Sequence, residues 1–153
     1  MKRLPLIVCY ARRAMVIGLV GAVAPDFDLF WCYLVDNGQR HHHLYPSHWP
    51  LLWFALLAAI LVWAAIAKNK LPAWLGVVFC LNSIAHLLLD TLVGDIWWLM
   101  PFVNKPFAFF HITAVNHPWW LNFLLHWSFL LELALVVAAI AMWCRRNAKM
   151  VNA

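Results

Sequence analysis

Side chains of the types that bind metal ions occur in three short motifs. Pro-Asp-Phe-Asp occupies residues 25–28, a histidine-rich stretch occupies residues 41–48, and His-Leu-Leu-Leu-Asp occupies residues 86–90. Histidine and carboxylate ligands together suit zinc, manganese, iron or nickel, and no Cys-x-x-Cys pair competes with them. The sequence therefore predicts a divalent metal site, with zinc the first choice. Its candidate ligands are Asp26, Asp28, His43, His48, His86 and Asp90.

The spacing of these residues also indicates which chemistry the site could do. A catalytic zinc site needs about three protein ligands and an open position for water, so this set is large enough for one ion or two. His86 and Asp90 are four residues apart and share one face of a helix. A carboxylate that does not coordinate the metal can act as a general base. We expect Asp28 and Asp90 to be the catalytic carboxylates.

Each motif also has a structural interpretation. Asp26 and Asp28 could form an ordinary turn after Pro25 in which an Asp caps the next helix. His86 could donate a hydrogen bond to a neighbouring helix. Of His41, His42 and His43, at least one is expected to be a solvated loop residue, and His43 is the preferred ligand because His48 follows five residues later. Five further polar residues, for which the sequence leaves the role open, are Asn122, His111, His117, His126 and Glu132.

The rest of the chain resembles a membrane protein. Apolar residues make up 66% of the 153 residues, charged residues only 11%, and the mean hydropathy is +0.78. Runs near the roughly 20 residues needed to cross a bilayer predict an all-α, integral membrane helical bundle with four segments in a single domain, 1–153. The first segment should break near Pro25, because proline lacks an N–H, with a short helix after it. The segments are expected at residues 14–35, 50–67, 71–93 and 119–143.

The basic residues indicate topology rather than nucleic acid binding. They flank the apolar runs in short clusters, and nine of the eleven fall on one side if the four segments alternate in direction. The positive-inside rule then places both termini in the cytoplasm. The same alternation brings all three polar motifs to the opposite, outer side of the membrane. Because ionisable groups at membrane depth are costly, their convergence there favours a functional site.

At these residues the chain resembles the bacterial membrane-bound, metal-dependent hydrolase family known as the YdjM-like group. That family carries Pro-Asp-x-Asp after an apolar helix, then a loop with two histidines five apart, then His-x-x-x-Asp followed by Gly and Pro-Phe. The corresponding elements here are residues 25–28, His43 with His48, and residues 86–90, followed by Gly94 and residues 101–102. The resemblance covers residues 16–102 and implies a metal-dependent hydrolase with the six candidate ligands at its site.

The chain departs from the family pattern at three points. Many members have a histidine before Pro-Asp-x-Asp, whereas none precedes His41 here. Leu44 stands where Arg is common, and Trp49 stands where Ser is usual. A missing ligand could be replaced by His41, His42 or His111.

These observations predict an enzyme of a bacterial inner membrane that hydrolyses an ester or phosphoester. A site at membrane depth favours a lipid or lipid-linked substrate, which can reach it laterally from the bilayer. Two alternatives remain open from the sequence: a membrane protein with a structural metal, and a metal or proton carrier that uses Glu132. The exposed apolar surface would also allow a homo-oligomer, although no motif specifies one.

Overall fold

The computed structural model describes residues 4–112, 115–117 and 120–151. The chain divides into two compact units, Met1–Phe109 and Phe110–Ala153. The described residues are almost all helical or in loops, and the only strand-like pairing among them is a single bridge between Ile96 and Phe107. The prediction of an all-α protein is therefore confirmed.

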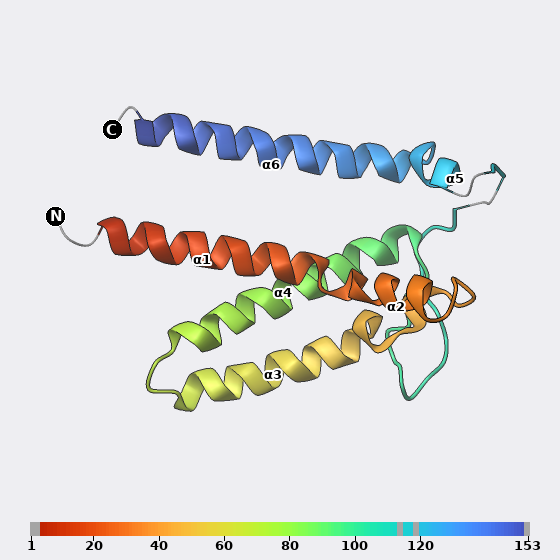
Figure 1. Cartoon of the computed structure of the whole chain (residues 1–153), viewed down its shortest axis with the longest axis horizontal. Helices are drawn as coiled ribbons and strands as arrows, with labels where there is room; N and C mark the ends of the chain where they lie inside the picture. Colours follow the sequence, from red (N-terminus) through yellow and green to blue (C-terminus); the bar gives the residue numbers. More distant parts are fainter. Residues whose placement is uncertain (1–3, 113–114, 118–119, 152–153) are drawn as a thin grey trace. The chain divides into compact units, whose positions relative to one another are not determined.

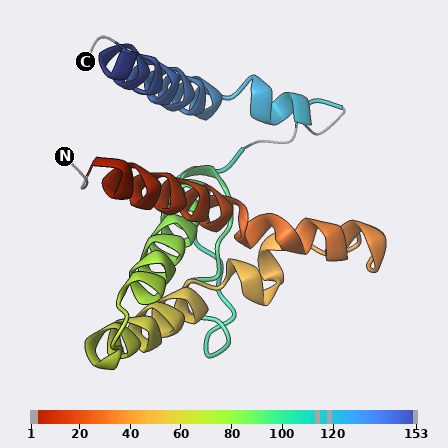
Figure 2. The ribbon, with the colours of Figure 1, turned by 60° about the vertical axis from the view of Figure 1, so that its left-hand side comes forward.

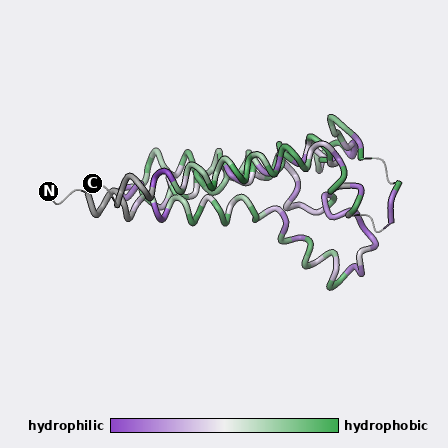
Figure 3. Tube along the Cα trace, turned by 90° about the horizontal axis from the view of Figure 1, so that it is seen from above, coloured by the Kyte–Doolittle hydropathy of each residue, from purple (hydrophilic) through white to green (hydrophobic). Residues whose placement is uncertain are grey.

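The first part is built on three long helices, α1 (Leu4–Val23), α3 (Pro50–Ile66) and α4 (Leu71–Val93). The connection between α3 and α4 is short, so the two helices run antiparallel, and α4 packs against both α1 and α3 (Figure 1). Figure 3 shows that these helices are coloured mainly as hydrophobic. The buried cluster between them is formed by Ala24, Trp53, Cys80, Ile84 and Leu87.

Small residues set the distance between α1 and α4. A methyl group on Gly21 would collide with the backbone carbonyl of Phe79, so α1 can approach this closely only with glycine at that position. Ser83 of α4 donates its hydroxyl to the Gly21 carbonyl at 2.8 Å. Small residues at close crossings and hydroxyl bonds between helices are typical of membrane helix packing.

The break at Pro25 is confirmed. After α1 ends, a 3-10 turn, η1 (Pro25–Phe27), leads into the short helix α2 (Asp28–Leu34). The segments Tyr10–Val23 and Pro25–Leu34 are bent by 51° relative to each other. Figure 2 shows the change of direction where α1 ends. The helix begins earlier than the predicted segment, since α1 continues back through Arg12 and Arg13 to Leu4. Arginine limits an apolar span but is a good helix former, which explains the difference.

The second part contains α5 (Trp120–Leu124) and α6 (Trp127–Val151). The predicted segment at 119–143 is therefore divided, and α6 begins only at Trp127. The Nδ1 atom of His126 lies 3.4 Å from the backbone N–H of Ser128 and 3.0 Å from its hydroxyl, so this side chain caps the start of α6. Asn122 is buried and bonds the backbone of Val115 and Asn116, which ties the preceding loop to α5.

Length and composition identify two helical segments that could cross a membrane, Leu71–Val93 and Trp127–Arg146. The bent pair Tyr10–Val23 and Pro25–Leu34 is a third candidate if it counts as one span. Helix α3 is strongly apolar but only 17 residues long. The described residues thus contain two or three candidate spans.

Candidate metal centre

The loop between α2 and α3 brings His48 to the end of α4. Two consecutive 3-10 turns, η2 (His42–Leu44) and η3 (Pro46–His48), carry the histidines. The indole N–H of Trp53 donates to the carbonyl of Ser47 at 2.7 Å, and that of Trp49 donates to the carbonyl of Leu44 at 3.1 Å. These bonds fasten the loop, and the side chain of His48 is completely buried.

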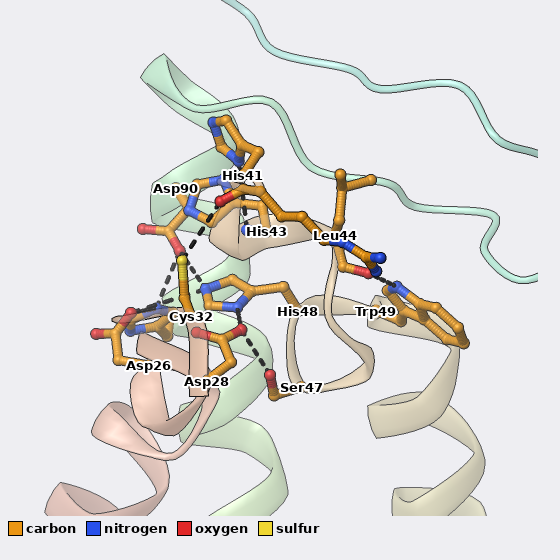
Figure 4. A network of polar contacts seen from close by, with 12 residues as sticks. Asp26, Asp28, Cys32, His41, His43, Leu44, Ser47, His48, Trp49 and Asp90 are labelled. Atoms are coloured by element: carbon orange, nitrogen blue, oxygen red, sulfur yellow. Dashed lines mark hydrogen bonds and ion pairs between the residues drawn. The ribbon is translucent and has the colours of Figure 1, made fainter. Parts of the chain in front are cut away.

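Three donor atoms from three separate elements converge, and two of them belong to Asp26 and His48, which Figure 4 shows close together. They are Oδ1 of Asp26 from η1, Nε2 of His48 from η3, and Nε2 of His86 from α4. Asp26 Oδ1 lies 3.7 Å from His48 Nε2 and 3.5 Å from His86 Nε2. All three atoms lie within 4.8 Å of one another, so this group could hold a metal ion.

Both imidazole nitrogens in this group are buried atoms without a hydrogen-bond partner. An unpaired buried polar atom is costly, and native proteins rarely leave one unexplained. Ligands about 2.0–2.1 Å from a tetrahedral zinc ion lie about 3.3 Å from one another, close to the distances between these donors. The donor set therefore fits a divalent metal ion.

Asp90 flanks the same group from the next turn of α4. Its Oδ2 atom lies 2.9 Å from Nε2 of His86 and 3.7 Å from Nε2 of His48. The separation from His86 is that of a close ion pair, although neither atom makes a hydrogen bond of normal geometry. Asp90 is therefore placed either to complete the coordination of an ion or to act beside it.

Asp28 has a different position from Asp26, although both belong to one motif. Its Oδ2 atom lies 2.5 Å from Nδ1 of His48 and accepts a hydrogen bond from the hydroxyl of Ser47 at 2.6 Å. A carboxylate that holds the outer nitrogen of a metal-binding histidine fixes the tautomer and the ring orientation. Asp28 thus pairs with Nδ1 of His48 through Oδ2, while its buried Oδ1 atom has no hydrogen-bond partner.

A second group of donors lies on the loop side of His48. Nitrogen atoms of His42, His43 and His48 are also within 4.8 Å of one another. Nδ1 of His43 donates to the backbone carbonyl of Asp95 at 2.9 Å, and its ring packs on Gly94, where a methyl group would come within 2.9 Å of the ring. Burial lowers the pKa of His43 to about 2, so its ring stays neutral and keeps an unprotonated nitrogen.

The structure brings together most of the residues predicted from the sequence. Asp26, His48, His86 and Asp90 converge, and His43 lies beside His48, with the two ring centroids 4.5 Å apart. His41 is exposed and accepts the backbone N–H of His43, so it caps η2. No spacing in the sequence favours His42 over its neighbours, and its place in the second group follows from the turn of η2. His111, His117, His126 and Glu132 belong to the second part of the chain.

Comparison with known proteins supports the membrane assignment. Residues 3–150 match the model of the family described as YdjM inner membrane protein. A search of curated proteins and a search of solved structures each gave no match. The matched region includes every residue of both donor groups and the helices that hold them. With its apolar helices and its cluster of histidine and aspartate side chains, this chain belongs to the YdjM inner membrane protein family.

Proposed function

We propose that this protein is a membrane-bound, metal-dependent hydrolase that cleaves an ester or phosphoester bond in a lipid or lipid-linked substrate. The observation that carries this proposal is the three-donor group of Asp26, His48 and His86 with the carboxylate of Asp90 beside it. Three protein ligands with a carboxylate beside them are the arrangement expected for a catalytic rather than a structural zinc site.

Access to the group is from the side of the carboxylates. The side chains of Asp26 and Asp90 are 34% and 27% exposed, whereas that of His48 is fully buried. Substrate and water would therefore approach Asp26 and Asp90, while the buried side chain of His48 closes the site behind them.

Each residue would have a distinct task. A divalent metal ion, preferably zinc, would activate water and polarise the bond to be cleaved. Asp90 would accept the proton of the attacking water, since its Oδ2 atom has no hydrogen-bond partner. Asp28 would keep the proton of His48 on Nδ1, so that Nε2 remains free to coordinate.

The topology supports an outward-facing site. The donors lie where α1 and α4 end and where α3 begins, while Lys68 and Lys70 lie at the opposite end, between α3 and α4. The positive-inside rule then assigns the lysine end to the cytoplasm. Helix α3 has 17 residues, which is the lower limit for a membrane span. We propose that it crosses the membrane as one of four spans and that both termini lie in the cytoplasm. The site would then face the periplasm.

The apolar surface next to the site supports a lipid substrate. Helix α2 buries Asp28 and Cys32, but its other faces expose large apolar side chains. Phe30, Trp31 and Leu34 are 64%, 58% and 79% exposed. These residues come within a few positions of Asp26 and Asp28, so an acyl chain lying on α2 would bring its head group near the carboxylates.

The test is hydrolysis by the purified, metal-loaded protein in detergent or lipid. We expect cleavage of phospholipid or lipid-linked esters but weak cleavage of short soluble esters. Asp90→Asn should lower the rate by about 10²-fold or more while the protein retains its metal. Cleavage of soluble esters but no lipid would refute the substrate assignment, and an Asp90→Asn variant with full activity would refute the role of Asp90.

A structural metal is the second candidate, because Asp90 is close enough to His86 to become a fourth ligand. In that case Asp90→Asn would weaken metal binding, and no substrate would be cleaved. The same variant therefore separates the two functions.

A further inference from the structure

His48 belongs to two donor groups at once. On one side are Asp26 and His86, and on the other are His42 and His43. The ring centroid of His48 lies 5.8 Å from that of His86 and 5.3 Å from that of His42. The loop histidines are therefore about as near to His48 as the ligand on α4.

The loop histidines are held in place as a binding site would require. The turn η2 is capped by His41, which accepts the backbone N–H of His43. Because a carbonyl only accepts, His43 must carry its proton on the Nδ1 atom that bonds Asp95, which leaves Nε2 with a free lone pair. His42 is half-buried beside it, with the two ring centroids 4.1 Å apart.

His48 can serve only one of the two groups at a time. Its Nδ1 atom is held by Asp28, and its Nε2 atom is the one without a hydrogen-bond partner. An imidazole nitrogen has a single lone pair, so Nε2 can bind only one ion.

We infer that His42, His43 and His48 form a second position for the metal ion, and that this position excludes occupation of the first. One ion per chain would then have two places, one with mixed oxygen and nitrogen ligands and one with three imidazoles. Three imidazoles are a good ligand set for zinc and similar ions. The half-buried His42 makes the second position a place where an incoming ion could bind before it moves to Asp26 and His86.

The inference rests on the proposed function in one respect, which is that the first position is the group of Asp26, His48 and His86. It is tested with zinc alone, on detergent-purified protein, by elemental analysis together with X-ray absorption spectroscopy, which counts coordinated imidazoles. For the wild type we expect one ion per chain with two imidazoles, from His48 and His86.

The decisive variant is Asp26→Asn/His86→Gln, which removes two ligands of the first position with little change in shape. We expect it to keep one ion per chain with three imidazoles and an affinity at least tenfold lower. Adding His42→Asn to this variant should abolish binding. His42→Asn alone is the matched control and should leave the wild-type ion and its two imidazoles unchanged.

Three results would overturn the inference. The first is two ions per wild-type chain, which would make the positions independent. The second is an Asp26→Asn/His86→Gln protein that keeps its helical circular dichroism but binds no zinc. The third is a variant ion that His42→Asn does not remove. If the double variant fails to fold, His86→Gln alone replaces it with the same expectations. Three imidazoles in the wild type itself would refute the first position, and hence the proposed function, but not the second position.

Discussion

The two carboxylates of the Pro-Asp-x-Asp motif have different partners. Asp26 and Asp28 are separated by one residue, yet Asp26 joins the donors while Asp28 pairs with the outer nitrogen of His48. The Pro-Asp-x-Asp motif predicted both as ligands. The spacing of the motif could not predict which carboxylate pairs with Nδ1 of His48, because that depends on the tertiary placement of η1 and η3.

A variant of Asp28 tests this division. In Asp28→Asn a neutral amide replaces the charged carboxylate and holds the proton of His48 on Nδ1 less strongly. Nε2 of His48 therefore becomes a poorer ligand. We expect the zinc affinity to fall by about 10–100-fold, as is typical when an outer partner of a metal ligand is lost. Competition titration against a chelator measures this.

The matched control is Ser47→Ala, which removes the other hydrogen bond to the same oxygen of Asp28 but leaves its charge. It should cause a smaller loss of affinity than Asp28→Asn. Unchanged affinity in Asp28→Asn, in a protein of normal helical content, would show that Asp28 does not position His48.

At the scale of elements, the apolar pattern predicted α3 and α4 to within a residue or so, and proline placed the break after α1. It missed the break before α6, because the few polar residues of segment 119–143 do not interrupt its apolar run and the capping by His126 is local. It also missed the early start of α1. Hydropathy indicates which residues can contact lipid. Hydrogen bonds and helix propensity decide where a helix starts and ends.

The close crossing of α1 and α4 positions the donors, since Asp26 follows α1 and His86 lies on α4. Gly21→Ala would push a methyl group into the Phe79 carbonyl and separate the two helices. We expect a loss of stability of about 1–3 kcal/mol, the usual cost of overpacking, together with weaker zinc binding. Thermal unfolding in detergent, with and without zinc, measures both effects.

Gly18→Ala is the control on the same helix. Its methyl group would meet the side-chain amide of Asn82 at 3.2 Å, and a side chain can move more easily than a backbone carbonyl. The interpretation of the crossing would be wrong if Gly18→Ala proved as damaging as Gly21→Ala.

For the whole molecule, the distribution of charge makes the strongest prediction, which is the orientation of the site. The exposed Gln39, in the loop that carries the histidines, should face the periplasm, and the exposed Asn69, between α3 and α4, should face the cytoplasm. In a variant without native cysteines, Gln39→Cys should react with a membrane-impermeant thiol reagent in intact cells. Asn69→Cys should react only after the cells are opened. The reverse pattern would place the site on the cytoplasmic side.

We expect one metal ion to bind through His48, the residue common to both donor groups. The decisive measurement is elemental analysis of the detergent-purified protein, compared with a His48→Asn variant of equal helical content. We expect about one zinc or similar ion per wild-type chain and none in the variant. A well-folded wild-type protein without metal, or a His48→Asn protein that retains its ion, would show that no metal ion depends on His48.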